Sequence, residues 1–191
     1  MTLQHNIFSS CFARLVVELG MGDGRLLEAL AKHDNNSLYV GIELDNDQCR
    51  KAQSRIRLSN VVIINRCIED AVPKFLDESI DEVIWVLPDP AFIDIGKVQH
   101  WKPFYKLVYF KLKEGGRLRL ITELTDELWQ PVSDKQYSKW VDLLISTFLS
   151  FGFILSCQNE GAPGQYFSHY LEQFRGDPKR IRMVTLDFLK Q

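Results

Sequence analysis

Short apolar runs alternate along the chain with segments of helical spacing. Five runs are rich in β-branched and other apolar residues and end at turn-forming or charged residues, which predicts strands at Val16–Leu19, Tyr39–Glu43, Val61–Ile64, Ile80–Leu87 and Arg117–Thr122. The segments between and after them predict helices over Leu26–Ala31, Asn46–Leu58, Ala71–Leu76, Trp101–Lys113 and Lys135–Ser150. Near the C-terminus, Phe153–Leu155 and Ile181–Phe188 predict a hairpin pair at a sheet edge.

Strands separated by helices indicate an α/β fold. This order predicts a doubly wound, mostly parallel, seven-stranded sheet of Rossmann-like type, with helices on both faces and right-handed crossovers. A length of 191 residues suits one compact domain spanning residues 1–191. The Gly- and Pro-rich stretch Gly161–Gln165 is expected to form a mobile loop.

Composition argues against several classes of protein. The formal net charge of −2 gives no overall basic bias, so any contact with nucleic acid must come from a local patch. The four cysteines contain no Cys-x-x-Cys pair and the four histidines show no ligand spacing, which argues against a metal site and a disulfide framework. No apolar run approaches membrane-spanning length and the N-terminus lacks a signal pattern, so we expect a cytoplasmic protein.

A glycine-rich turn follows the first predicted strand. The run Gly20-Met21-Gly22-Asp23-Gly24 leads into a helix, and Glu43 ends the next strand about 20 residues on, where a nucleotide-binding unit places its ribose-binding acid. A dinucleotide fingerprint would need its third glycine at position 25, which is Arg25. Glu18, in the strand end, would repel a pyrophosphate but suits the ammonium group of a methionine moiety. The spacing therefore favours S-adenosylmethionine over a dinucleotide.

Each of these features also has a purely structural interpretation. Three glycines in five residues can form a tight strand-to-helix turn, and a carboxylate at a strand end can be merely solvated. Their combination in one strand–turn–helix–strand unit favours cofactor binding, because a carboxylate accepts strong hydrogen bonds from both ribose hydroxyls. We therefore expect Glu18, Gly20, Gly22, Gly24 and Glu43 to bind the cofactor.

Further acidic residues follow the ends of other predicted strands. Parallel sheets bind ligands at the carboxyl ends of their strands, so these residues should converge on one edge. They are Glu69 and Asp70, expected at the cofactor, together with Asp89 between two prolines and Glu123. An isolated Pro-Asp-Pro can be only a rigid turn, but its position after the fourth strand favours a functional role for Asp89.

The residues at these positions resemble those of the class I S-adenosylmethionine-dependent methyltransferases, and within them the tRNA guanine-N7 methyltransferases. The similarity runs from about residue 17 to residue 123. Its strongest part matches that family's Phe-Pro-Asp-Pro motif, and all of its parts are Leu87–Pro90, Glu18–Gly22, Gly41–Glu43, Asn60-Val61, Asp70–Val72, Gly115-Gly116 and Ile121–Glu123. The resemblance implies cofactor contacts at Glu18, Gly20, Gly22, Glu43 and Asp70, and an active-site role for Asp89.

The chain also departs from that family's pattern. The loop Ala91–Gly96 contains no basic residue, whereas the family continues with Lys, Arg and His after its Pro-Asp-Pro. The family's segment before the first strand is longer than Met1–Arg14, and its late Thr-x-x-Glu motif has only a partial counterpart in His169–Glu172. Glu123 stands where the family has an aspartate.

The predicted chemistry needs carboxylates and no strong base. Guanine N7 carries a lone pair and no proton, and its methylation makes the ring cationic, so nearby carboxylates would stabilise the charge and accept from the base's N1 and N2 donors. Asp89, Glu123 and Glu172 suit that task, and Phe92 could stack on an unpaired base. If RNA binds, its phosphates would contact the densest basic stretch, although such runs are more often solvated: Arg175, Lys179, Arg180 and Arg182.

Three functional hypotheses remain open from the sequence. The leading one is a methyltransferase acting on a base nitrogen of RNA, with guanine N7 of tRNA favoured. The second keeps the cofactor but takes a small molecule or protein as substrate, which the near-neutral charge permits. The third is a cofactor-binding module without catalysis of its own that serves as a partner in a complex. The sequence leaves open a protein partner or a homodimer, and whether a partner supplies the missing positive surface.

Overall fold

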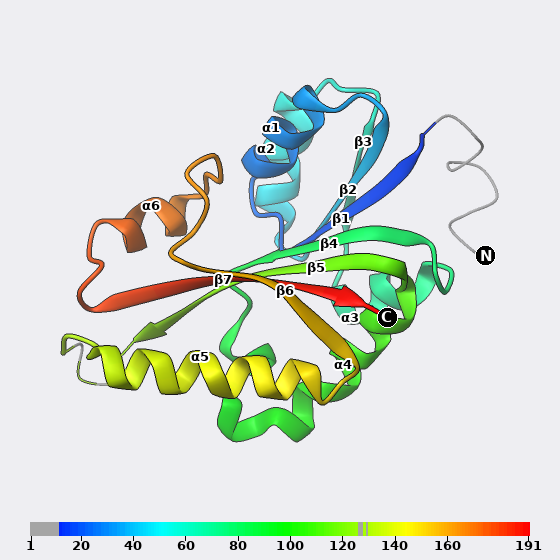
Figure 1. The fold of residues 1–191 in the computed structure, drawn as a ribbon. Coiled ribbons are helices and arrows are strands. Elements are labelled where there is room, and N and C mark those ends of the chain that lie inside the picture. The colour runs from blue at the N-terminus through cyan, green and yellow to red at the C-terminus, as the bar shows by residue number, and fades with distance from the viewer. Residues whose placement is uncertain (1–11, 126–127, 129) are drawn as a thin grey trace.

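A computed structural model describes residues 12–125, 128 and 130–191 of the chain (Figure 1). Strands and helices alternate from the N-terminus, as the apolar pattern predicts. The strands are β1 Arg14–Leu19, β2 Ser37–Glu43, β3 Val61–Asn65, β4 Ile80–Val86, β5 Leu112–Thr125, β6 Phe153–Glu160 and β7 Ile181–Lys190. The helices are α1 Arg25–His33, α2 Asn46–Arg55, α3 Ile68–Ala71, α4 Val98–Lys111, α5 Asp134–Leu149 and α6 His169–Arg175, with short 3-10 turns η1 Val72–Lys74, η2 Pro90–Phe92 and η3 Ile95–Lys97.

The seven strands form one sheet in the order β3-β2-β1-β4-β5-β7-β6. The pairs from β3 through to β5 are parallel, whereas β7 runs antiparallel to both β5 and β6. The predicted class, a doubly wound and mostly parallel sheet, is confirmed. The strand order reverses between β1 and β4, and open α/β sheets bind ligands outside such a switch point.

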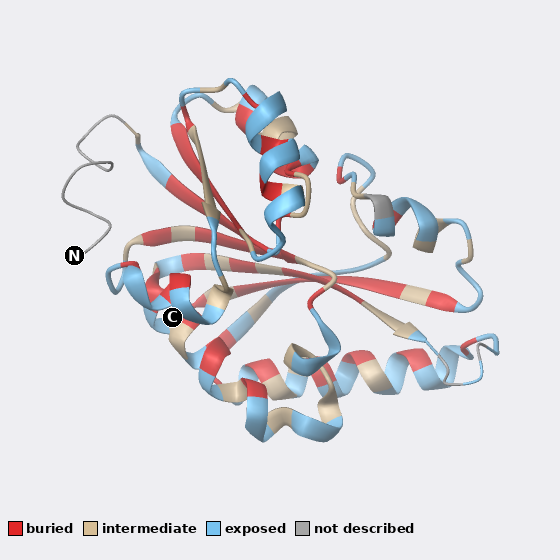
Figure 2. Ribbon diagram, turned by 180° about the vertical axis from the view of Figure 1, so that it is seen from behind, coloured by how far each residue is buried: buried red, intermediate tan, exposed pale blue. Residues whose placement is uncertain are grey.

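Two apolar clusters cover the two faces of the sheet (Figures 1 and 2). One is built from α1, α2 and the α6 segment, and includes Leu27, Ala52 and Leu171. The other is built from α3, α4 and α5, and includes Trp101 and Phe148. The alternation of side chains along each strand supplies both clusters, which explains why the central strands read as continuous apolar runs.

The predicted strand pair near the C-terminus is confirmed, because β6 and β7 pair antiparallel at one end of the sheet, with β6 at the edge and β7 between β6 and β5. Other elements differ from the prediction. The predicted helix over residues 71–76 is the short α3 followed by a 3-10 turn, since Pro73 lacks the amide donor that a continuing helix needs. Helix α6 was not predicted. Strand β5 begins at Leu112, five residues before the predicted start at Arg117, and its pairing with β4 has a register shift between Ile80 and Glu82.

Candidate active site

The glycine turn connects β1 to α1 at the centre of the sheet's carboxyl edge. Gly20, Gly22 and Gly24 have φ angles of +65°, +56° and +75°, the left-handed region that only glycine enters without strain. The Met21 amide donates to the Ile42 carbonyl at 3.1 Å, which ties the turn to the end of β2. Gly24 is buried and caps α1, so among the three it has a packing role.

Glu43 shapes the same turn from the end of β2. Its Oε2 accepts from the Gly22 amide at 2.8 Å and its Oε1 accepts from the Asp45 amide at 2.8 Å. A carboxylate has about four acceptor sites, so two remain for ribose hydroxyls. The side chain is partly exposed at the pocket, as a ribose-binding acid requires.

Glu18 is a buried carboxyl group with an unsatisfied oxygen. The residue is 3% exposed, and its Oε2 has no hydrogen-bond partner among the described residues. Burial, followed by the nearby charges of Asp23 and Glu43, raises the pKa of Glu18 well above its ordinary value of 4.5. Because a buried polar atom without a partner is costly, this oxygen fits a ligand donor such as the methionine ammonium of S-adenosylmethionine.

Two adjoining hollows open over the carboxyl ends of the strands. They have volumes of about 590 Å³ and about 630 Å³, within the usual range for ligand pockets of about 300–1,000 Å³. Gly20, Glu43, Val86 and Leu87 line both of them. Glu18 and Gly22 line the first hollow, and Glu69, Asp89 and Phe92 line the second. The structure thus brings most of the predicted site residues together at one edge of the sheet.

Asp89 lines the second hollow and is the third residue after the end of β4. Its Oδ1 accepts from the Ala91 amide at 2.8 Å and caps the 3-10 turn η2. Leu87, just before Pro88, has a φ of +52°, a strained conformation for a leucine, and its amide donates to the Ile121 carbonyl at 2.7 Å. Asp89 therefore has a structural role in its turn and also faces a ligand pocket.

Phe92 lines the second hollow and also packs against the aromatic residues behind it. Its ring centroid lies 5.3 Å from that of Trp85 and 5.3 Å from that of Phe104, and the side chain is only partly exposed. The predicted stacking role would be restricted to the part of the ring that these two neighbours leave uncovered.

Of the remaining predicted site residues, Glu69 lines the second hollow and the others do not line either hollow. The exposed Glu69 accepts from the Cys67 thiol at 3.0 Å, which raises the pKa of Cys67. Glu123 has a buried Oε2 without a hydrogen-bond partner among the described residues, and burial raises the pKa of Glu123. Four predicted residues are absent from the linings of the two hollows: Gly24, Asp70, Glu123 and Glu172.

The sequence interpretation missed one wall of the first hollow. Phe167, Ser168 and Tyr170 line it from the start of α6, and the two aromatic side chains are 48% and 63% exposed. The local signal was Ser168, whose hydroxyl accepts from the Leu171 amide at 3.1 Å and starts the helix.

The basic stretch expected to contact phosphates has partners within the chain. Arg175 donates to backbone carbonyls, Arg180 pairs with Asp177, and Arg182 lies between Asp134 and Glu160. These three arginines are thus engaged in structural contacts. The sequence did not show this, because their partners come from other parts of the chain or from the backbone.

Two further findings concern metals and membranes. Within residues 12–125, 128 and 130–191, no group of three His, Cys, Asp or Glu side chains is arranged to hold a metal ion. No helix in this described part has the length and apolar character needed to cross a bilayer.

The fold and the glycine–acid site define a class I methyltransferase architecture. The Methyltransf_4 family, described as "Putative methyltransferase", matches residues 13–143, and the chain belongs to this family. The predicted resemblance to S-adenosylmethionine-dependent methyltransferases is thereby confirmed, as is the cofactor.

Curated relatives agree with this assignment. The chain is 31% identical over 132 residues to a tRNA (guanine-N(7)-)-methyltransferase of Serratia proteamaculans, covering 64% of this chain and 52% of the relative. A protein of the same name from Xanthomonas axonopodis pv. citri is 29% identical over 130 residues, covering 61% of this chain and 48% of the relative. The chain therefore spans about half the length of the curated relatives it matches.

Solved structures share the fold. A 16S rRNA methyltransferase, KamB, superposes with a TM-score of 0.70 at 13% identity, covering 95% of this chain and 89% of that one. A protein from Listeria monocytogenes described as a "putative S-adenosylmethionine dependent methyltransferase" gives a TM-score of 0.67 at 20% identity, covering 97% of this chain and 94% of that one. At these identities the similarity concerns the architecture.

Proposed function

We propose that this protein transfers a methyl group from S-adenosylmethionine to the N7 atom of a guanine in tRNA. The observation that carries the proposal is the position of Asp89, between two prolines after β4, in a hollow that shares Gly20 and Glu43 with the cofactor site. The two distant relatives named for this reaction support the choice of substrate.

The proposed reaction forms the N7–methyl bond as the sulfur–methyl bond breaks, and the sulfonium becomes a neutral thioether. S-adenosylmethionine supplies an activated methyl group, so the attacking nitrogen, which carries no proton, needs no general base. The protein's main task is alignment of donor and acceptor, which can contribute about 7–11 kcal/mol in favourable systems.

The roles of the chain's own residues follow from their positions. Glu18 would accept from the methionine ammonium with its unpaired oxygen, and Glu43 would accept from the ribose hydroxyls. Asp89 keeps one oxygen free of the turn contact, which could accept from guanine N1 and N2 and stabilise the positive ring. Glu123 would add negative charge at the end of β5.

One observation favours a second candidate, a methyltransferase for a small molecule or protein. The net charge is −2, and three of the four arginines and lysines in the basic stretch have internal partners. RNA binding draws most of its affinity from contacts between cations and phosphates, so a small or uncharged substrate would also suit this surface.

The decisive experiment is mass spectrometry of nucleosides from unmodified tRNA incubated with the protein and S-adenosylmethionine. We expect 7-methylguanosine, and we expect Asp89→Asn to reduce its formation about a hundredfold, the size of loss typical for one positioned electrostatic group. Asp94→Asn is the matched control, because Asp94 caps the neighbouring 3-10 turn with the same 2.8 Å contact to a backbone amide but does not line either hollow.

The other outcomes are informative. A different methylated nucleoside would show that another atom is the methyl acceptor. Methyl groups found only in a protein or metabolite fraction would favour the second candidate. Equal losses in the Asp89 and Asp94 variants would return Asp89 to a purely structural role in its turn.

A further inference from the structure

The wall of the first hollow formed by Phe167, Ser168 and Tyr170 lies outside the segment that matches the methyltransferase family, which ends at residue 143. This wall and the cofactor residues Glu18 and Glu43 line the same hollow. It is carried by a short helix at the end of a Gly- and Pro-rich segment. Its placement therefore depends on contacts with the rest of the fold.

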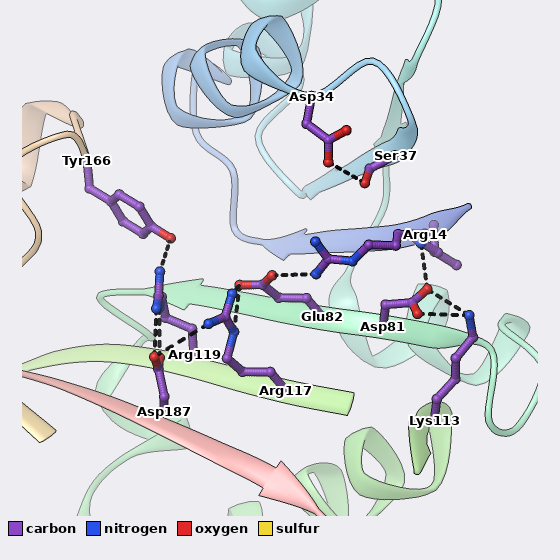
Figure 3. A network of polar contacts seen from close by, with 11 residues as sticks. Arg14, Asp34, Ser37, Asp81, Glu82, Lys113, Arg117, Arg119, Tyr166 and Asp187 are labelled. Carbon is purple, nitrogen blue, oxygen red and sulfur yellow. Dashed lines mark hydrogen bonds and ion pairs between the residues drawn. The ribbon is translucent and has the colours of Figure 1, made fainter. Parts of the chain in front are cut away.

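Tyr166 anchors this segment to the sheet. The residue is 1% exposed and belongs to the apolar cluster that contains Ile121, Leu171 and Met183. Its hydroxyl accepts from Arg119 Nη1 at 2.9 Å (Figure 3). The position directly before the pocket-lining Phe167 is thus fixed by both apolar packing and a charged hydrogen bond.

Arg119 is itself held rigidly on β5. Its Nε and Nη2 donate to the two carboxylate oxygens of Asp187 on β7, at 2.7 Å and 2.6 Å. Such bidentate pairs are the strongest and most directional of the charge-assisted hydrogen bonds. Figure 3 shows that the third nitrogen of the guanidinium is the one that reaches Tyr166.

A second arginine fixes the backbone at the anchor and three residues before it. Arg175, at the end of α6, donates to the Tyr166 carbonyl at 2.9 Å and to the Pro163 carbonyl at 2.6 Å. Tyr166 therefore accepts from an arginine at its hydroxyl and from another at its carbonyl. The loop predicted to be mobile is tied down at residues 163 and 166.

Arg117 provides an internal comparison. It lies two residues before Arg119 on the same face of β5 and pairs with Glu82 at 2.8 Å and with Asp187 at 3.8 Å. The contacts described for it all end on the sheet, whereas Arg119 also reaches the α6 segment (Figure 3). The two arginines share charge and surroundings but differ in the contact to Tyr166.

We propose that Arg119 is a positioning residue for the ligand pocket, which acts through Tyr166 to hold Phe167, Ser168 and Tyr170 as a wall of the hollow that the glycine turn also lines. Arg119 does not itself line the two ligand hollows. This proposal rests on the cofactor site and is independent of the choice of methyl acceptor.

The test compares Tyr166→Phe and Arg119→Lys with Arg117→Lys. Two quantities are measured: the affinity for S-adenosylmethionine by calorimetry, and the hydrogen exchange of backbone amides in residues 166–175. We expect both test variants to exchange faster in this segment and to bind about tenfold more weakly, since a hydrogen bond to a charged group contributes about 1.5–3 kcal/mol. Arg117→Lys should leave both quantities near those of the parent.

Tyr166→Phe keeps the apolar packing, so it tests the contact even where Arg119→Lys lowers the stability of the sheet. Unchanged exchange and affinity in Tyr166→Phe would overturn the proposal, as would equal effects in the Arg117 and Arg119 variants. A parent protein that binds S-adenosylmethionine but does not methylate tRNA would contradict the proposed substrate and leave this proposal intact.

Discussion

Glu43 combines two tasks in one side chain, the shaping of the glycine turn and the proposed binding of ribose. Replacing it with alanine removes both acceptors of the Gly22 and Asp45 amides as well as the ribose contact. We expect Glu43→Ala to weaken S-adenosylmethionine binding at least about tenfold, because hydrogen bonds to charged groups contribute about 1.5–3 kcal/mol. Calorimetry measures this directly, and Glu43→Gln, which keeps one acceptor oxygen, should lose less. Tight binding of NAD in place of S-adenosylmethionine would contradict the assignment of the turn.

We expect Glu18 to lower the free energy of unfolding of the ligand-free protein, while its carboxylate binds the cofactor. Its pKa in the folded protein is raised by burial, Asp23 and Glu43, so between the ordinary value of 4.5 and the higher folded value the folded state holds a proton that the unfolded state has lost. The free energy of unfolding therefore falls as pH rises through this window, by about 1.4 kcal/mol per pH unit for one group.

The variant Glu18→Gln removes this titration. We expect it to unfold at a higher temperature than the parent at neutral pH, and to lose that advantage as the pH falls towards the ordinary value of 4.5. Its affinity for S-adenosylmethionine should fall, because an amide cannot neutralise an ammonium group. Thermal unfolding followed across pH, paired with calorimetry, separates the two effects. A stability difference that does not vary with pH would contradict a raised pKa of Glu18 in the folded protein.

At the scale of elements, the glycine turn packs against β2 at a position that has no side chain, Gly41. A Cβ placed on Gly41 of β2 would lie 2.3 Å from the Met21 sulfur and 2.8 Å from Leu27 Cδ2. The turn can therefore seat Met21 on β2 only because residue 41 is glycine. This contact gives a physical reason for the Gly41-Ile42-Glu43 run.

We expect Gly41→Ala to lower the free energy of unfolding by about 1–3 kcal/mol through overpacking, and to weaken cofactor binding by displacing the turn. Gly164→Ala is the control, since a Cβ there meets no atom within 4 Å. Denaturant unfolding measures the first effect and calorimetry the second. Equal stabilities in the two variants would show that Met21 can move aside freely.

At the scale of the whole molecule, we propose that residues 1–191 form one cooperative domain. The C-terminal strand β7 lies inside the sheet, and its Phe188 is fully buried and stacks on Phe148 of α5 with ring centroids 4.8 Å apart. Phe188→Ala should cost about 3–5 kcal/mol. Phe110→Ala, at a ring that is 57% exposed, should change stability by less than about 1 kcal/mol.

If the chain is one cooperative domain, Phe188→Ala should also affect strands far from β7. Amide hydrogen exchange should accelerate in the distant strands β1, β2 and β3 as well as in β7, because a single unit unfolds globally. Faster exchange confined to β6 and β7 would instead show that the C-terminal part opens by itself.

The order of elements and half of the site were accessible from local sequence. Glu18, Gly20, Gly22 and Glu43 belong to one contiguous strand–turn–helix–strand unit, and parallel strands bring their carboxyl ends to one edge wherever the sheet forms. The three left-handed glycines were recognisable for the same reason, since glycine adopts those backbone angles without strain. Such features depend on chain direction and on residues near in sequence.

Contacts between distant segments decided the rest. The insertion of β7 between β5 and β6, the wall at Phe167 and Tyr170, and the pairing of Arg119 with Asp187 across 68 residues left no periodic or spacing signal in the chain. The partners of Arg175 and Arg182 were hidden in the same way, so a run that looked free to meet phosphates is engaged within the fold. Apolar periodicity indicates which face of an element is buried, but it does not indicate which element packs against that face. The neighbour is determined only when the whole sheet assembles.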